Sequence, residues 1–231
     1  MRKAIKSLVL GALVLIVLNP SSVQAYSNNR MIEDQIFDDL GRMNESQIRG
    51  FLEGTEANPR LAGGSPCLKA HTNINFHWDG SNWNYGDGTK SQNGQLVAAT
   101  WNTAWGPAQL PAYSIIGKTA AMWGFNPQVI LSTLQKEQSL VWGTNCSSTR
   151  FNSAMGYDCP DSGGLYDYPA RGVSGTCVAH ERYVGFTRQV LWGSWQLKFA
   201  KERSIGNTGW NGDSGLVYGG YMTQGTYRRC G

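Results

Sequence analysis

The clearest recurrence of apolar positions in the chain predicts a helix over residues 126–142. Ile130, Leu134 and Val141 recur at helical spacing and therefore share one face, while most residues between them are polar. Glu137 falls on the same face, at a position that the pattern otherwise gives to apolar side chains. A carboxylate there is expected to lose water, which disfavours its charged form. A protonated glutamic acid can serve as a general acid and give its proton to a leaving oxygen.

A structural role for Glu137 fits the same pattern. A glutamate at the edge of an apolar face can pair with an arginine from another helix, and one such carboxylate is weak evidence of catalysis. The segment that follows favours the catalytic interpretation. Residues 153–157 are compact and largely apolar, and Gly156 would let another group approach the backbone closely.

Three further helices are expected, over residues 44–52, 110–123 and 182–199. The first has Asn44 as its cap and Gln47 three residues later, which is the signature of a capping box. The helix over residues 126–142 has a start signal of its own, because asparagine caps well and proline suits the first helical position. In the helix over residues 44–52 the expected buried positions are Ile48, Phe51 and Leu52. In the helix over residues 110–123 they are Tyr113, Ile116, Ala120 and Trp123, and in the helix over residues 182–199 they are Phe186, Val190, Gly193 and Leu197.

Tryptophans outside these apolar faces are candidates for ligand contact. Residues 71–95 are dense in Gly, Asn and Asp, which favour turns over regular structure, and they contain Trp78 and Trp83. A flat indole suits the C–H face of a sugar ring, but both side chains can equally pin a long loop to the core. In the last helix, Trp192 and Trp195 fall outside the apolar face and are expected to meet a neighbouring element or a groove.

The start of the chain predicts export. Three basic residues precede an unbroken apolar run over residues 8–18, and residues 23–25 form a small-residue cleavage site. The run is too short to cross a bilayer, so we expect a cleaved signal peptide and no stable membrane span afterwards; an uncleaved anchor is the alternative. Removing the three basic residues leaves 17 of the 20 lysines and arginines against 16 acidic residues.

The near-equality of basic and acidic residues in the mature chain bears on which partners are expected. A nearly neutral protein without a basic patch interleaved with aromatics argues against a nucleic-acid partner. The three histidines lack ligand spacing and the five cysteines form no C-x-x-C pair. We therefore predict neither a metal nor another cofactor.

Several segments resemble known families. A glutamate-bearing helix followed by a loop and an Ala-x-Gly-aromatic segment is similar to the lysozyme-like superfamily, in particular goose-type lysozymes and soluble lytic transglycosylases. Some segments resemble secreted bacterial proteins described as haemagglutinin-like or transglycosylase-like, namely residues 45–52, 124–127, 134–140, 154–161 and 183–190. The resemblance extends from about residue 30 to about residue 200. One difference is that transglycosylases usually carry serine directly after the catalytic glutamate, whereas Gln138 precedes Ser139 here.

The resemblance implies a mainly α (α+β) fold, a lysozyme-like helical domain with long irregular loops. The expected organisation is a signal peptide over residues 1–25, this domain over residues 26–203 with the Trp/Gly/Asn-rich loop at 71–95, and an irregular segment over residues 204–231. Because the sequence stops at Gly231 without a helix stop or polar tail, we expect a truncated chain whose missing part follows it.

The resemblance also implies a site. Glu137 would be the catalytic residue, and Met155, Gly156 and Tyr157 would line the cleft. The resembled segments add Tyr183 and Gln189 as further substrate-binding residues. They also contain two candidates for a second carboxylate, Asp158 and Asp161. A loop aspartate beside proline, however, more often fixes a turn.

Export makes disulfides expected, and five cysteines leave one over. The resemblance pairs Cys159 with Cys177 beside the cleft. A disulfide between Cys67 and Cys146 can then form, and it would leave Cys230 to pair with a cysteine beyond the given sequence. A less favoured alternative is a cysteine peptidase with Cys67 as the nucleophile near a histidine, because exported chains usually spend cysteines on disulfides.

These observations together predict a secreted or cell-envelope protein that acts as a monomer on the glycan strands of peptidoglycan. Glu137 would protonate the oxygen between N-acetylmuramic acid and N-acetylglucosamine. A hydrolase needs a second carboxylate, whereas a lytic transglycosylase can reuse its glutamate to take a proton from the sugar's own 6-hydroxyl. The lack of a second carboxylate at a motif position favours the transglycosylase. The alternative is a non-catalytic glycan-binding or adhesion module on the same fold.

Overall fold

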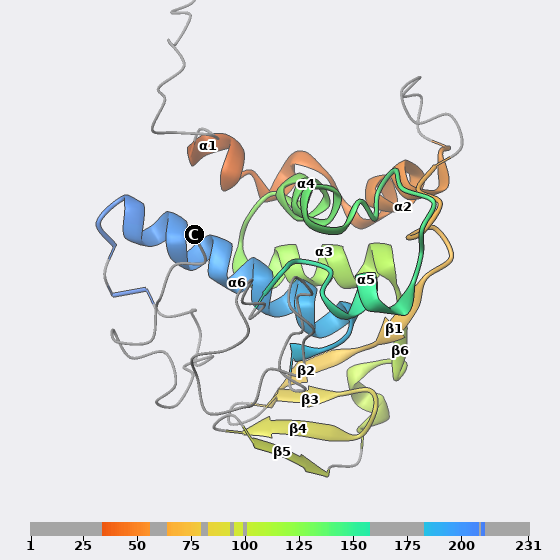
Figure 1. Cartoon of the computed structure of the whole chain (residues 1–231). Coiled ribbons are helices and arrows are strands. Elements are labelled where there is room, and N and C mark those ends of the chain that lie inside the picture. Colours follow the sequence, from red (N-terminus) through yellow and green to blue (C-terminus); the bar gives the residue numbers. More distant parts are fainter. Residues whose placement is uncertain are drawn as a thin grey trace, which may run out of the picture. The chain divides into compact units, whose positions relative to one another are not determined.

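The computed structural model describes residues 34–55, 64–79, 83–92, 95–98, 101–157, 183–207 and 209–210. Its helical segments are α1 (Asp34–Phe37), η1 (Leu40–Arg42), α2 (Glu45–Glu53), η3 (Thr103–Trp105), α3 (Ala112–Trp123), α4 (Pro127–Gln138), α5 (Ser148–Asn152) and α6 (Phe186–Ser204). Its strands are β1 (Thr72–Ile74), β2 (Phe76–Trp78), β3 (Trp83–Tyr85), β4 (Thr89–Gln92), β5 (Gln95–Ala98) and β6 (Gln109–Pro111). The described part is therefore a mixed α+β structure in which helices predominate (Figure 1).

The four helices expected from the sequence are present, and local capping signals set where two of them begin. In α2 the Asn44 side chain accepts a hydrogen bond from the Gln47 N–H at 2.9 Å, and the Gln47 side chain accepts one from the Asn44 N–H at 3.0 Å. This is the predicted capping box. In α4 the Asn126 side chain accepts from the Gln128 N–H at 2.9 Å, with Pro127 in the first turn as predicted.

The prediction of an irregular loop over residues 71–95 is wrong. Strands β2 to β5 form an antiparallel sheet in sequence order, and β1 pairs separately with β6. The residues that suggested turns lie partly at the connections, as with Gly88, whose φ of 81° starts the return from β3 into β4. Between these connections the chain has the alternation of a strand, which the abundance of Gly, Asn and Asp obscured.

The sheet is joined to the helices by aromatic side chains. Trp83 on β3 is 1% exposed, and its ring contacts those of Phe76, Trp123 and Trp192, with centroids 5.6–6.4 Å apart. Of the two roles considered for Trp83, the structure therefore supports pinning this region to the core. Trp78 is half-buried, with its ring 5.4 Å from that of Trp83.

Helix α6 lies at the centre of the core, between the sheet and the other helices (Figure 1). Trp192 and Trp195 meet neighbouring elements, which was one of the two options expected: each is 1% exposed, and their rings contact those of Trp83 and Trp210. The first half of α6 is covered on all sides, so its 3.6-residue pattern does not separate a buried face from an exposed one. Gly193 allows the expected close packing, since a Cβ there would lie 2.6 Å from the Met155 Cβ.

A disulfide joins Cys67 to Cys146 across 79 residues of sequence. This pairing removes the free thiol that the cysteine-peptidase alternative requires. The predicted signal peptide, the Cys159–Cys177 pair, Asp158, Asp161 and Cys230 lie outside the described residues, as does the predicted C-terminal segment except for residues 204–207 and 209–210. Within the residues that the structure does describe, no helix combines the length and apolarity needed to cross a membrane.

The environment of His71 predicts a loss of stability in acid. Its ring stacks on Phe151 with centroids 3.8 Å apart, and burial lowers its pKa from 6.5 to about 4. Below pH 6.5 the His71 imidazole binds a proton in the unfolded chain but stays neutral in the folded chain. The free energy of unfolding therefore falls as the pH drops from 6.5 toward about 4. We expect the urea midpoint of His71→Leu to depend less on pH in this window than that of the wild type. Equal dependence in both proteins would contradict this role of the histidine.

Candidate functional site

Helix α4 ends directly after Glu137. Ser139 adopts the left-handed conformation with φ of 53°, and its N–H donates to the Gln135 carbonyl at 2.9 Å. Glu137 is thus in the last turn, and its side chain is 33% exposed. The predicted desolvation of Glu137 is therefore wrong. Ile130 and Leu134 are fully buried on the same face, but the helix stops before a further turn can cover the carboxylate.

The charges around Glu137 come from basic side chains at the carboxyl end of α4. Its Oε1 lies 3.1 Å from Nζ of Lys136, which is itself 78% exposed. An arginine is also present, but Arg150 donates to the backbone carbonyl of Gln138 at 2.8 Å and so caps the helix end. Within the described residues, the ion pair of Glu137 is with lysine and not with the buried arginine of the structural alternative.

Gly156 lies directly against the Glu137 carboxylate. A Cβ added to Gly156 would be 3.2 Å from Oε2 of Glu137 and 3.6 Å from its Cδ. The backbone of Gly156 also has φ of +67°, which side-chain-bearing residues rarely adopt. Both observations explain why the position is glycine. They agree with the expectation that another group approaches the backbone closely here.

Gln189, on α6, positions the turn that carries Gly156. This side chain is fully buried, and its Oε1 accepts from the N–H groups of Met155 at 3.3 Å and Tyr157 at 3.0 Å. Its Nε2 donates to the carbonyls of Tyr157 and Tyr183, both at 3.0 Å. Both donors and both acceptor directions of the amide are thereby used within the protein. Gln189 therefore supports the site, and the expected role in contacting substrate does not fit its surroundings.

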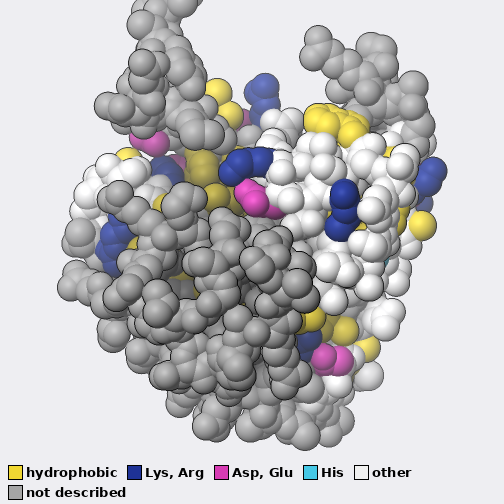
Figure 2. Space-filling model, viewed as in Figure 1, with side chains coloured by type: hydrophobic (Ala, Val, Ile, Leu, Met, Phe, Trp, Pro, Cys, Tyr) yellow, Lys and Arg dark blue, Asp and Glu magenta, His cyan; other side chains and the backbone are white. Residues whose placement is uncertain are grey.

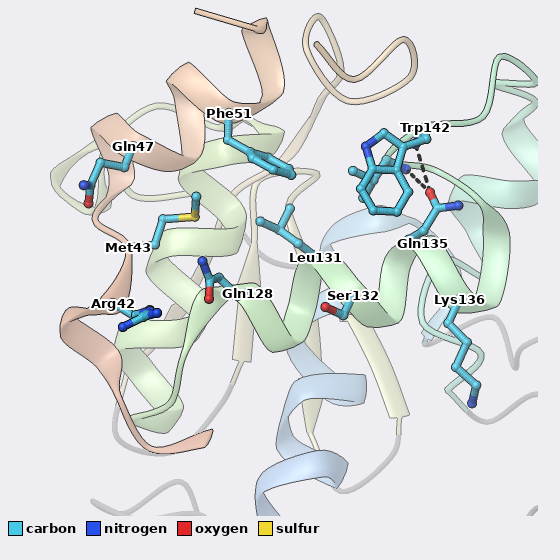
Figure 3. Close-up of a pocket in the computed structure, with 11 residues that line it drawn as sticks. Arg42, Met43, Gln47, Phe51, Gln128, Leu131, Ser132, Gln135, Lys136 and Trp142 are labelled. Atoms are coloured by element: carbon cyan, nitrogen blue, oxygen red, sulfur yellow. Dashed lines mark hydrogen bonds between the residues drawn. The ribbon is translucent and has the colours of Figure 1, made fainter. Parts of the chain in front are cut away.

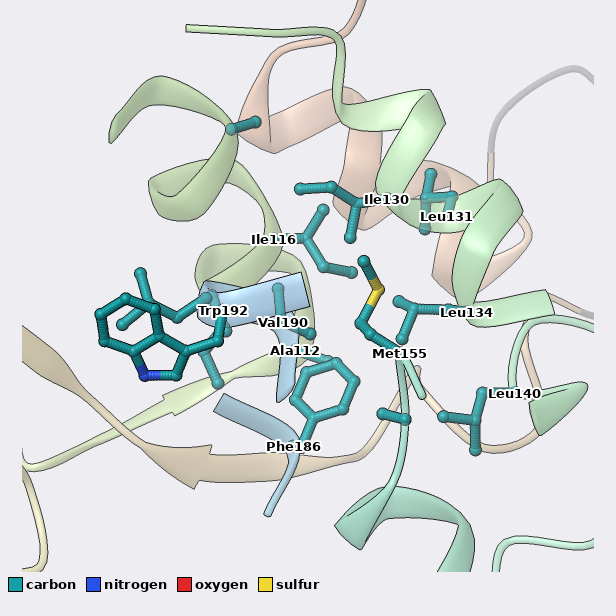
Figure 4. Packing of buried hydrophobic residues seen from close by; sticks show 14 of the residues in the cluster. Ala112, Ile116, Ile130, Leu131, Leu134, Leu140, Met155, Phe186, Val190 and Trp192 are labelled. Atoms are coloured by element: carbon teal, nitrogen blue, oxygen red, sulfur yellow. The ribbon is translucent and has the colours of Figure 1, made fainter. Parts of the chain in front are cut away.

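The other predicted substrate-binding side chains, those of Met155, Tyr157 and Tyr183, are buried. Tyr157 and Tyr183 are 7% and 6% exposed, and their rings meet edge to face at 4.9 Å. The sequence predicted that Tyr183 lies on the last helix, but α6 begins after it, at Phe186. Met155 points into the core among Ile116, Leu134 and other apolar side chains (Figure 4). Of the predicted set, Gly156 is the member that meets Glu137.

A groove of about 630 Å³, which was not predicted from the sequence, lies on the face of α4 opposite Glu137 (Figure 3). Helix α4 contributes Gln128, Leu131, Ser132 and Gln135 to it, at the spacing i, i+3, i+4, i+7. A second stripe, rich in amide and hydroxyl groups, was therefore readable beside the apolar one. In Figure 2, basic and acidic side chains are interspersed over the described part of the face in view.

No protein-family model, curated protein or solved structure matches the chain. The chemistry of the site therefore has to be argued from its own geometry. That geometry consists of one accessible carboxylate, a glycine turn against it and a buried amide that fixes the turn. A group arranged in this way can exchange a proton with a ligand lying over the turn.

Proposed function

We propose that the chain is an extracytoplasmic enzyme of the lysozyme-like type that cleaves the glycan strands of peptidoglycan, with Glu137 as its general acid and base. The observation that carries this proposal is the Glu137 carboxylate seated against Gly156 while remaining 33% exposed. A proton donor must be both fixed in place and reachable by substrate. The disulfide between Cys67 and Cys146 supports an oxidising location outside the cytoplasm.

In the proposed reaction, Glu137 donates its proton to the oxygen between N-acetylmuramic acid and N-acetylglucosamine. The bond from the muramic C1 to that oxygen breaks, and positive charge develops at C1. The ionised Glu137 then takes the proton of the same sugar's 6-hydroxyl, whose oxygen bonds to C1 and closes a 1,6-anhydro ring. The proton lost by Glu137 is thereby recovered. This route needs one carboxylate, which Glu137 supplies without either of the two aspartates considered as a second carboxylate.

The direct test is digestion of purified, insoluble peptidoglycan by the full chain with its disulfide intact. We expect soluble fragments to appear in proportion to enzyme and time. Binding of the protein to peptidoglycan without release of fragments would reject the enzyme and favour the second candidate. That candidate is a glycan-binding module without catalysis, and the exposed Trp142 favours it, because it offers a sugar-sized aromatic face away from Glu137.

Replacing Gly156 by alanine is expected to reduce turnover by about tenfold or more, because the new Cβ displaces the carboxylate against which it would lie. The matched control is Gly124→Ala, since Gly124 has nearly the same φ, +68°, but nothing within 4 Å of an added Cβ. Each variant should lose about 1 kcal/mol of stability through backbone strain. Equal turnover of the two variants, measured per folded molecule, would show that contact with Gly156 does not position Glu137.

A further inference from the structure

The groove on the far side of α4 has the composition of a saccharide site. It lies between α2, η1, α4 and the turn that follows α4 (Figure 3). Phe51, Leu131 and Val141 give it apolar surface. Its uncharged polar lining consists of amide and hydroxyl side chains that can bind sugar hydroxyl and acetamido groups, namely Gln47, Gln128, Ser132 and Gln135. Gln47 and Gln135 would do so through Nε2, because their Oε1 atoms accept hydrogen bonds from backbone N–H groups.

Trp142 provides an aromatic platform at this groove. It is 57% exposed, whereas Trp83, Trp192 and Trp195 are the largest fully buried side chains of the described residues. Its backbone is held in place, because Oε1 of Gln135 accepts from the N–H groups of Trp142 at 2.9 Å and Val141 at 3.2 Å. Figure 3 shows the indole beside the Gln135 side chain at one end of the groove. A fixed, exposed indole presents a flat apolar face suited to the C–H face of a pyranose.

The charges of the lining select for an anion. Two cationic side chains, Arg42 and Lys136, line the groove, and none of the described residues that line it is acidic. Lys136 is already paired with Glu137 at 3.1 Å, whereas Arg42 makes no ion pair within the described residues. Figure 3 shows the two cations at opposite ends of the groove. From Gln128, beside Arg42, to Lys136 the helix rises about 12 Å, which leaves room for more than one sugar.

We propose that this groove is a binding site for a carboxylate-bearing saccharide, separate from the site at Glu137. The Trp142 indole stacks on a sugar ring, the glutamine amides bind its hydroxyl and acetamido groups, and the Arg42 guanidinium pairs with the carboxylate. Gln128, Leu131, Ser132 and Gln135 face away from Ile130, Leu134 and Glu137, whereas Lys136 lies between the two faces, where it lines the groove and pairs with Glu137. The inference does not depend on cleavage at Glu137.

The test uses two disaccharides that differ by one O-lactyl group, which carries the carboxylate, namely N-acetylglucosaminyl-N-acetylmuramic acid and N,N′-diacetylchitobiose (called chitobiose below). The indole N–H resonance of Trp142, assigned by its loss in Trp142→Phe, reports binding in the groove of the full chain. We expect both sugars to shift this resonance, with tighter binding of the muramic acid disaccharide. Arg42→Gln should weaken that disaccharide by about threefold to fivefold and leave chitobiose unchanged. Arg49→Gln, at an exposed arginine of α2 outside the groove, is the matched control.

Three outcomes would overturn the proposal. The Trp142 resonance could fail to move with either sugar, or Arg42→Gln could leave the preference for the muramic acid disaccharide intact. The resonance could also shift with protein concentration alone, which would assign the groove to a second copy of the chain. The same titration on Glu137→Gln, which releases Lys136 from its ion pair, should keep the preference for the muramic acid disaccharide and the dependence of that preference on Arg42. Failure of the catalytic proposal would leave a protein that binds sugar in the groove but does not cleave peptidoglycan. Failure of the groove proposal would leave a protein that cleaves peptidoglycan but does not bind sugar in the groove.

Discussion

Glu137→Gln is expected to lower turnover on peptidoglycan by roughly 10²–10⁴-fold, because an amide keeps the shape of the side chain but cannot deliver a proton. The free energy of unfolding should change by less than about 1 kcal/mol, since the ion pair that is lost is with an exposed lysine. Both quantities are measured on the same preparation, as fragment release per folded molecule and as the midpoint of urea unfolding. Low activity with unchanged stability identifies a catalytic group.

The matched control for this substitution is Glu53→Gln. The Glu53 side chain is also 33% exposed and also pairs with one basic side chain, that of Arg49 at 2.8 Å, but it lies on α2 away from Gly156. It should retain full activity with a similarly small change in stability. If Glu137→Gln were instead destabilised while keeping its activity per folded molecule, the carboxylate would be structural and the catalytic assignment would fall.

Gln189→Leu is expected to lower the free energy of unfolding by about 3–5 kcal/mol, the largest change in stability predicted here. Leucine has a similar volume but leaves two backbone N–H groups and two carbonyls without the partners that Gln189 supplies. Because these groups are buried, water cannot replace the lost hydrogen bonds without opening the core. Chemical unfolding at equilibrium measures the difference directly.

The control for Gln189→Leu is Gln128→Leu, since Gln128 is an exposed glutamine on α4 whose side chain faces the groove. Its stability should stay within about 0.5 kcal/mol of the wild type. Peptidoglycan cleavage by the folded fraction of Gln189→Leu should also fall, because the turn that carries Gly156 loses its anchor. A Gln189→Leu protein as stable as the wild type would show that water or a rearranged backbone satisfies these groups.

Sequence reasoning succeeded where the signal is local. The capping box of Asn44 and Gln47 and the cap at Asn126 each act within one turn of helix, so neighbouring residues suffice to predict them. It failed where the outcome depends on covering elements. Trp192 falls outside the predicted apolar face of α6 but is buried, because strand β3, in a region expected to be an irregular loop, brings Trp83 against it.

The candidate site shows the same division. Proximity of Glu137 to Gly156 was expected from the resemblance of the two segments, and the structure places them in contact. The exposure of Glu137 was not expected, because the periodic pattern continues through Val141 while the helix ends at Gln138. The role of Gln189 depends on four backbone groups from two distant segments, which no spacing along the chain encodes.

Mass spectrometry of the fragments released from purified peptidoglycan tests the role of Glu137 most directly. The proposed reaction predicts fragments that end in 1,6-anhydro-N-acetylmuramic acid, lighter by one water than reducing ends, from the wild type and not from Glu137→Gln. Reducing ends from the wild type alone would keep Glu137 as the acid but replace ring closure by hydrolysis. Intact strands after treatment with the folded wild type, or equal release by both proteins, would contradict the proposed function.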